Sequence, residues 1–215
     1  MIDPTFLFRF SVPCYYASSP RGNGQFELGP EYRLPSLSEL DGRPQFADFR
    51  LGWNEDGLVI RLCVKGKSQS PWCRQNRMED SDGLQVWLDT RAGVNVHRAG
   101  RYSHRFGFLP CGGGQGFQMP VADQMLIHRA RENAEPVRPG QLKLHRSLEP
   151  DGYILSCRLP AAALTGYDPA QYERIGFTYA VVDRELGWQT MTVGPELPFT
   201  EDPSLWATLE LVREK

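Results

Sequence analysis

The stretch Phe49-Arg-Leu-Gly-Trp-Asn-Glu-Asp-Gly-Leu-Val-Ile-Arg-Leu-Cys-Val-Lys65 indicates the fold class. Its central Asn54-Glu-Asp-Gly57 is turn chemistry, with Asp-Gly at the end. On each side of this centre, every second position is apolar, as is typical of strands with one face in a core: Phe49, Leu51 and Trp53 come before it, and Leu58, Ile60, Leu62 and Val64 come after it. The stretch therefore predicts a β-hairpin.

The same alternation recurs along the chain, at residues 6–12 (Phe6, Phe8, Phe10 and Val12), 84–88, 104–108, 153–159, 177–181 and 205–211. Helix signals are restricted to two short turns, at residues 160–164 and 169–173. The 17 prolines and 21 glycines are distributed along the chain and disfavour long helices. We therefore predict an all-β fold, an antiparallel β-sandwich of jelly-roll type, with at most one or two short helices.

Chain length and net charge limit the number of domains and the kinds of partner that we expect. The 215 residues suit one large β-sandwich domain spanning residues 1–215. A net charge of −2 gives no general attraction to nucleic acid or an anionic membrane, so we expect neither as a partner. No stretch approaches the roughly 20 apolar residues that span a bilayer. The N-terminus carries no signal-peptide pattern and the five cysteines form no CxxC pair, which favours a cytoplasmic protein with reduced thiols.

Motifs for catalysis are absent from the sequence. The four histidines, at 97, 104, 128 and 145, show no zinc-ligand spacing, and no GxSxG nucleophile motif occurs. The glycine-rich run Cys111-Gly-Gly-Gly-Gln-Gly116 lacks the Lys-Ser/Thr that a phosphate loop requires. We therefore expect no enzyme, although Glu79, Asp80 and Asp82 leave a hydrolase as an alternative.

The cluster Glu79-Asp-Ser-Asp82 places three carboxylates within four residues. Calcium prefers several oxygen ligands, so Asp82 is a weak candidate for a structural calcium site. A solvated turn before the strand at residue 84 is the favoured interpretation. We expect no cofactor.

Aromatic residues outside the alternating segments are more informative. Trp72 lies in the polar stretch Ser68-Gln-Ser-Pro-Trp-Cys-Arg-Gln-Asn76, Trp188 follows a turn, and Phe199 lies in Pro195-Glu-Leu-Pro-Phe-Thr-Glu-Asp202. Exposed rings of this kind suit sugars, whose C–H faces stack on an aromatic surface. The alternative is that the rings close the ends of the sandwich. Trp53 and Trp206, in strand patterns, are expected in the core.

The order of motifs resembles the family 9 carbohydrate-binding modules and the related DOMON-like β-sandwiches. The motifs are Leu51-Gly-Trp-Asn-Glu-Asp-Gly-Leu-Val-Ile60, Pro71-Trp72, Asp82-Gly-Leu-Gln-Val-Trp-Leu-Asp89, His104-Arg-Phe-Gly-Phe108, Asp151-Gly-Tyr-Ile-Leu155, Ile175-Gly-Phe-Thr-Tyr-Ala-Val-Val-Asp183 and Phe199-Thr-Glu-Asp-Pro-Ser-Leu-Trp-Ala-Thr-Leu-Glu-Leu211. The resemblance covers about residues 47–213. Residues 1–46 diverge from the family and are expected to add a strand or to cover a sheet edge.

The resemblance implies a jelly-roll sandwich that binds a terminal sugar between two aromatic walls and catalyses nothing. Trp72 matches one wall, Phe199 falls where the family has a second tryptophan, and Trp188 is a further candidate. Gln85 and Arg105 match strand positions that bond sugar hydroxyls, although the family often has an acidic residue at the position of Gln85. The expected partner is a sugar or glycan. Because the second wall is changed, an intracellular protein-interaction or structural module that has lost sugar binding stays an alternative.

Overall fold

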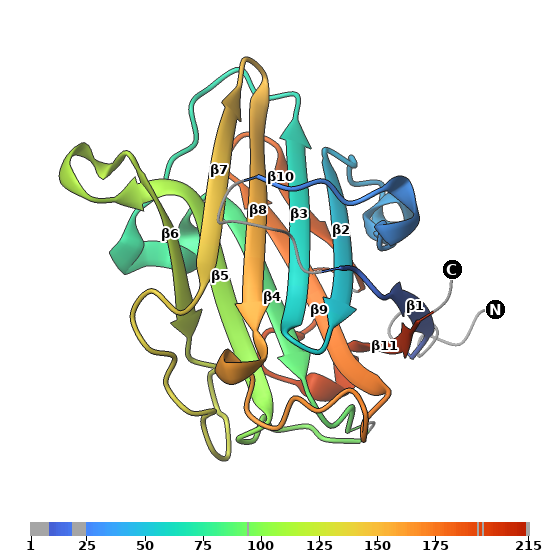
Figure 1. Ribbon diagram of the computed structural model, residues 1–215. Helices are drawn as coiled ribbons and strands as arrows, with labels where there is room; N and C mark the ends of the chain where they lie inside the picture. Colours follow the sequence, from blue (N-terminus) through green and yellow to red (C-terminus); the bar gives the residue numbers. More distant parts are fainter. Residues whose placement is uncertain (1–8, 19–24, 94, 193, 195, 214–215) are drawn as a thin grey trace.

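The computed structural model describes residues 9–18, 25–93, 95–192, 194 and 196–213. These residues form two β-sheets packed face to face (Figure 1). The strands are β1 (Ser11–Tyr15), β2 (Ala47–Asn54), β3 (Gly57–Lys65), β4 (Gly83–Asp89), β5 (Ser103–Gly113), β6 (Met119–Met125), β7 (Lys143–Glu149), β8 (Gly152–Pro160), β9 (Arg174–Asp183), β10 (Gly187–Thr190) and β11 (Ala207–Val212).

The larger sheet has the strand order β1-β11-β9-β4-β5-β6, with β10 also paired to β9, and the smaller sheet has the order β2-β3-β8-β7. Neighbouring strands are antiparallel except for β1 and β11, which are parallel. The predicted antiparallel β-sandwich is confirmed.

The core between the sheets comes from the alternating apolar residues. Both halves of the predicted hairpin contribute to it, together with side chains such as Leu84, Phe106, Leu155, Phe177 and Leu209. Asn54 pairs with Gly57, which leaves a two-residue turn as predicted. Gly57 has φ +132°, and a Cβ there would lie 2.1 Å from the carbonyl oxygen of Leu159, so glycine is required at this position.

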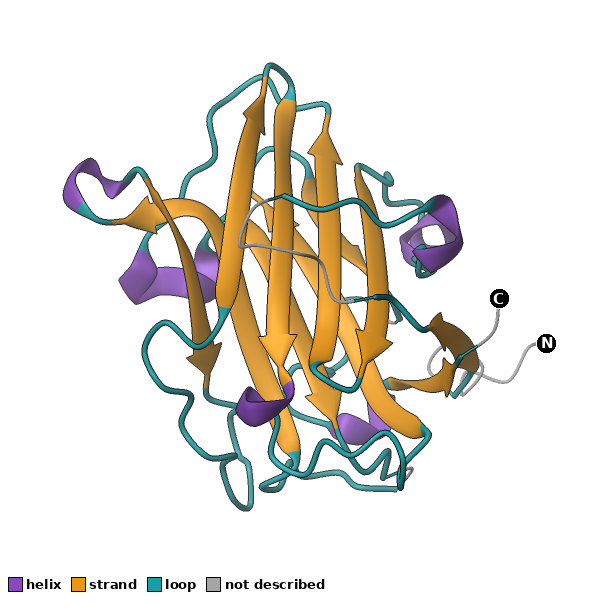
Figure 2. Ribbon diagram, in the orientation of Figure 1, coloured by secondary structure: helices purple, strands orange, loops and turns teal. Residues whose placement is uncertain are grey.

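Helical structure is limited to short 3-10 turns, and the described residues contain no α-helix (Figure 2). The turns are η2 (Pro30–Tyr32), η3 (Ser38–Asp41), η4 (Gln75–Asp80), η5 (Gln115–Phe117), η6 (Ala161–Ala163) and η7 (Pro203–Leu205). The expected turn at residues 160–164 is η6, whereas residues 169–171 form a non-helical turn. Each of these turns is short, in line with the predicted scarcity of helix. In the described part of the chain, no helix is long and apolar enough to cross a membrane.

The N-terminal region adds both a strand and a cover. Strand β1 pairs with β11, and Ala17 and Leu28 pack on Val59 of β3, on the side away from the main core. Strand β1 begins at Ser11, later than the predicted strand at residues 6–12. Phe6 and Phe8 of that prediction lie outside the described residues.

Candidate functional site

The outer face of the larger sheet carries most of the predicted site residues. On β4, Leu84, Val86 and Leu88 belong to the core between the sheets, so Gln85, Trp87 and Asp89 lie on the outer side. Simple alternation predicts that such a face is open to solvent. The structure shows instead that every residue of β4 is buried. A second apolar cluster covers this face, formed by Trp87, Ala99, Ile127, Ala180, Phe199 and Trp206.

Phe199 belongs to this cover. Its side chain is 0% exposed, and its ring meets the indole of Trp87 edge-on, with centroids 5.3 Å apart. The Nε1 of Trp206 donates a hydrogen bond to the carbonyl oxygen of Phe199 at 2.7 Å, which fixes the loop above the sheet. The expectation that Phe199 is an open stacking wall is therefore wrong, because the indole of Trp87 needs an apolar cover and Phe199 supplies it.

Gln85 and Arg105 lie together, as two partners of one polar site should. Arg105 Nη2 donates to Gln85 Oε1 at 2.7 Å, and its Nη1 donates to Glu79 Oε1 at 2.7 Å. Gln85 Nε2 donates to the carbonyl oxygen of Glu79 at 3.2 Å. Gln85 and Arg105 are only 2% and 4% exposed, whereas Glu79 is half-exposed. Because Glu79 bonds to both residues, it lies between them and the solvent. Burial lowers the pKa of Arg105, while the nearby Glu79 acts in the opposite direction.

Trp72 is half-buried on a segment, residues 67–74, that we call the strap. Its backbone N–H donates to Asp82 Oδ2 at 3.0 Å, and the N–H of Asp82 donates back to the carbonyl oxygen of Trp72 at 2.9 Å. Guanidinium carbons of Arg184, Arg74 and Arg77 lie 4.4, 5.3 and 5.7 Å from the ring centroid. Trp72 thus combines an aromatic surface with nearby cationic hydrogen-bond donors.

A buried ion cluster holds the strap in place. Lys67 Nζ lies 2.5 Å from Asp183 Oδ2 and 3.3 Å from Asp82 Oδ2, and all three side chains are at most 3% exposed. Burial alone would lower the pKa of Lys67, but the hydrogen bond to Asp183 and the charge of Asp82 raise it above its ordinary value. The ammonium is therefore charged and neutralises part of the carboxylate charge.

Asp82 is consequently a poor metal ligand in this fold. Its Oδ1 accepts the N–H of Arg184 at 2.9 Å, and its Oδ2 accepts from Lys67 and Trp72. The Lys67 ammonium occupies the place that a cation would take beside Asp82 and Asp183. Over the described part of the chain, no group of three or more His, Cys, Asp or Glu side chains is arranged to hold a metal ion. The weak calcium prediction at Asp82 is thus not supported, and Asp82 orders the loop around Trp72.

Trp188 lies at the same end of the outer face as the strap. It pairs with Val182 of β9, and Val182 also pairs with Gly83 of β4, so these residues form one row across three strands. Trp188 is half-buried beside the second apolar cluster. Arg184, which lies close to the Trp72 ring, follows Val182 by two residues. The structure therefore places Trp72, Arg184 and Trp188 around the same end of the sheet.

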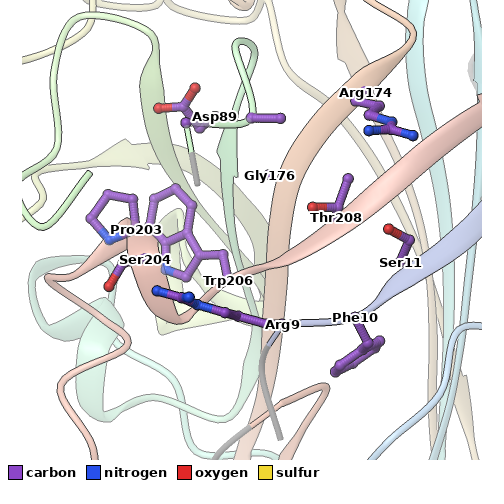
Figure 3. Close-up of a pocket in the computed structure, with 12 residues that line it drawn as sticks. Arg9, Phe10, Ser11, Asp89, Arg174, Gly176, Pro203, Ser204, Trp206 and Thr208 are labelled. Atoms are coloured by element: carbon purple, nitrogen blue, oxygen red, sulfur yellow. The ribbon is translucent and has the colours of Figure 1, made fainter. Parts of the chain in front are cut away.

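A cleft of about 280 Å³ opens at the opposite end of this face (Figure 3). Its lining includes Trp206, Arg9, Asp89, Arg174 and Thr208, and it contains none of the predicted binding residues. Trp206 is buried, as predicted, although it precedes β11 instead of lying in it. The cleft combines an indole with charged and hydroxyl groups, and no sequence motif indicated it, because its residues come from four separated segments.

Beside this cleft, Ser204, His97 and Asp202 make contacts that sequence spacing does not reveal. Ser204 Oγ and Asp202 Oδ2 each lie 3.1 Å from His97 Nδ1. A catalytic triad requires the carboxylate and the hydroxyl to engage different ring nitrogens, so that a proton passes across the imidazole. Here the Ser204 hydroxyl and the Asp202 carboxylate contact the same nitrogen, Nδ1 of His97. These three residues therefore make a local loop contact and do not have the geometry of a triad.

Comparisons with known proteins concern the fold. No protein-family model matches the sequence, and no curated protein matches it at a significant level. Two solved structures of a family 9 carbohydrate-binding module from Caldicellulosiruptor kristjanssonii resemble the chain, each with 14% sequence identity. The complex with cellotriose has a TM-score of 0.62 and covers 95% of both chains. The complex with glucose has a TM-score of 0.64 and covers 95% of this chain and 97% of the other.

A candidate carbohydrate-binding protein from Bacteroides uniformis also resembles the chain, with a TM-score of 0.56 and 12% identity over 94% of this chain and 99% of the other. The resemblance to DOMON-like sandwiches stays a prediction. Because the similarity to the two family 9 structures extends over nearly the whole of each chain, this protein has the fold of a family 9 carbohydrate-binding module.

Proposed function

We propose that this chain is a non-catalytic carbohydrate-binding module that holds a sugar at the end of the larger sheet, between Trp72 and Trp188. The observation that carries the proposal is that modules with this fold bind cellotriose and glucose, with coverage of about 95% of this chain. Fold similarity alone does not determine a ligand. This end of the sheet must therefore offer the chemistry that a sugar needs.

A sugar ring presents an apolar C–H face and a rim of hydroxyls, so its site needs an aromatic surface flanked by hydrogen-bonding groups. The half-buried indoles of Trp72 and Trp188 supply two such surfaces. The guanidinium of Arg184, which lies over the Trp72 ring at 4.4 Å from its centroid, supplies hydrogen-bond donors beside that tryptophan. In this proposal Trp188 takes the role that the sequence assigned to Phe199.

Gln85, Arg105 and Glu79 have a different role in this proposal. Because Gln85 and Arg105 are buried and bonded to each other, a sugar meets the exposed carboxylate of Glu79 first. Glu79 restores the acidic group that family resemblance led us to expect at position 85. The Arg105 bond at 2.7 Å holds this carboxylate in place, so Arg105 acts on the ligand indirectly.

The contribution of one tryptophan to the binding free energy follows from the indole area that a sugar covers. A sugar covers one face of an indole, about half of the roughly 200 Å² that a tryptophan side chain can bury. At about 25 cal/mol per Å², this is about 2.5 kcal/mol. Removing one wall should therefore weaken binding by roughly 60-fold.

The test has two stages. A glycan array on the full chain identifies ligands, with glucose and cello-oligosaccharides included, and isothermal titration calorimetry then measures their affinity. We expect Trp72→Ala and Trp188→Ala each to weaken binding by at least about tenfold. Arg174→Ala is the matched control, because Arg174 lines the cleft at the opposite end of the sheet and its side chain is exposed.

Three outcomes would contradict the proposal. The first is that the folded wild type binds no glycan, which would favour a protein-interaction or structural module. The second is that both tryptophan variants bind as tightly as the wild type. The third is that Arg174→Ala alone loses binding, which would move the site to the cleft in Figure 3.

A further inference from the structure

Two cysteines meet where the strap lies on the larger sheet. Cys73, next to Trp72, is buried, and Cys111 near the end of β5 packs against it in a small cluster that also contains Met78 and Leu109. Gly112 permits this close approach. It has φ +111°, and a Cβ there would lie 3.0 Å from the Cβ of Cys73, so a side chain at position 112 would displace the strap.

The two thiols differ in access. Cys111 is half-buried and lines a cleft of about 260 Å³ between the strap and β7. Its Sγ donates to the carbonyl oxygen of Pro71 at 3.4 Å. Cys73 lies behind it and donates to the carbonyl oxygen of Asp82 at 3.2 Å. A reagent that enters the cleft therefore reaches Cys111 before Cys73.

The more accessible thiol, Cys111, is also the one that ionises more readily. When Cys111 ionises, the Cys73 thiol can turn its one hydrogen from the Asp82 carbonyl to the Cys111 thiolate, which lowers the pKa of Cys111 to about 7; the positive charge of Arg146 contributes, while burial opposes the change. The interaction with Cys111 and burial raise the pKa of Cys73. The charged groups around the pair and its cleft are Lys67, Arg74, Asp82, Arg146, Glu149, Asp183 and Glu185. Lys67 is paired with buried carboxylates, so Arg74 and Arg146 are the cations that favour a thiolate at Cys111 and attract a ligand with carboxylates.

We propose that Cys111 and Cys73 form a thiol–disulfide exchange site for small acidic disulfides of the glutathione type. The Cys111 thiolate attacks one sulfur of the disulfide, so that a mixed disulfide forms and one ligand thiolate leaves. Cys73 then gives up its proton to solvent and attacks the Cys111 sulfur, so that an intramolecular disulfide forms and the second ligand thiolate leaves. The two departing thiolates take up protons at neutral pH, and the ligand gains the two electrons that the cysteine pair loses.

This inference is independent of sugar binding. All five cysteines are free thiols in the structure, so both partners are in the reduced form that the first step requires. Cys63 offers a matched control, because it is also half-buried but lies on β3 away from the pair, and burial raises its pKa above 9.0.

A rate difference follows from the opposite pKa shifts of the two cysteines. At pH 7 a much larger fraction of Cys111 than of Cys63 is thiolate, because the pKa of Cys111 is lowered to about 7 and burial raises that of Cys63. The lower intrinsic nucleophilicity of the more acidic thiol offsets part of this difference. We therefore expect Cys111 to react with oxidised glutathione severalfold faster than Cys63.

The experiment treats the full chain with oxidised glutathione at pH 7, traps free thiols with iodoacetamide over time, and maps each cysteine by peptide mass spectrometry. In the wild type we expect a Cys73–Cys111 disulfide. In Cys73→Ser the mixed disulfide should accumulate at Cys111, in Cys111→Ser neither product should form, and Cys63→Ser should behave as the wild type. Wild-type mapping does not depend on any variant folding.

Three results would overturn the proposal. One is glutathione attachment to Cys63 at a rate equal to or above that at Cys111. Another is a mixed disulfide at Cys111 that persists in the wild type without cross-linking. The third is a wild type that stays fully reduced under these conditions.

Discussion

Replacing Lys67 with methionine should destabilise the fold and loosen the Trp72 strap. Methionine retains much of the apolar stem of lysine but removes the ammonium that lies between Asp82 and Asp183. The variant therefore leaves two buried carboxylates without their shared counter-charge. Asp82 also holds the backbone of Trp72, so the loss acts directly on the candidate site.

The size of the expected loss in stability follows from the burial of Lys67 and its two carboxylate partners. Lys67 is 3% exposed, and its two closest partners are 2% and 0% exposed, so water cannot replace the lost charge without local opening. Breaking a buried ion pair by removing one partner costs about 3–5 kcal/mol. Because domains of this kind have about 5–15 kcal/mol of stability in total, the change should be a large fraction of it.

Urea unfolding, monitored by tryptophan fluorescence, measures this cost. Lys65→Met is the matched control, since Lys65 is exposed at the end of β3 and should change stability by no more than about 0.5 kcal/mol. The pKa of Lys67 is raised in the folded state, so its contribution is complete below the unfolded pKa of about 10.4 and decreases as pH rises through the folded value. The difference in free energy of unfolding between wild type and Lys67→Met should thus be constant between roughly pH 6 and 9, and it should shrink in more alkaline solution as Lys67 loses its proton.

A loss below about 1 kcal/mol would refute the reasoning, because it would mean that the carboxylates are solvated and that Lys67 is a surface ion pair. An unchanged rate of limited proteolysis within the strap would refute the second part, that this cluster orders the segment around Trp72.

Two further predictions concern buried rings. Burial lowers the pKa of His104 to about 4, so below about pH 6.5 the unfolded chain takes up a proton that the folded chain excludes, and stability should fall by up to about 3 kcal/mol between pH 6.5 and 4. His104→Phe should remove this slope from urea midpoints measured across that range, and an equal slope in both proteins would contradict the assignment. Phe199→Ala should lower the free energy of unfolding by about 3–5 kcal/mol, because it exposes Trp87. A stable Phe199→Ala with reduced sugar affinity would instead support an exposed wall.

The sequence was sufficient to predict the central strands because two independent signals agreed there. In the hairpin of β2 and β3, apolar alternation and the turn residues Asn54-Glu-Asp-Gly57 both indicated two strands joined by a tight turn, and Asn54 and Gly57 pair on either side of it. Strands β6, β7 and β10 were missed for physical reasons. Strands β6 and β7 lie at sheet edges and bury few residues, so their sequences alternate weakly, and β10 has only four residues.

The candidate site was only partly predictable. Trp72 was identified because a tryptophan in a polar stretch requires a contact, and the structure places it on a strap fixed by Asp82. Phe199 was misjudged because alternation along β4 indicates which face each residue occupies but not what covers that face. Lys67 escaped notice altogether, since a lysine after a strand is ordinarily solvated, and its two carboxylate partners come from positions 15 and 116 residues away.

The covering of the outer face limits where a ligand can bind on it. Its middle is occupied by Phe199 over Trp87. A ligand must therefore bind at one of the two ends of β4, either near Gly83, where Trp72 and Trp188 lie, or near Asp89, in the cleft of Figure 3. At about 3.3 Å per residue, these ends are roughly 20 Å apart. Single substitutions show which end takes part in binding, and substitutions at the two ends should act additively, because coupling is weak beyond about 10 Å. A double variant that departs from additivity would show instead that one ligand spans both ends.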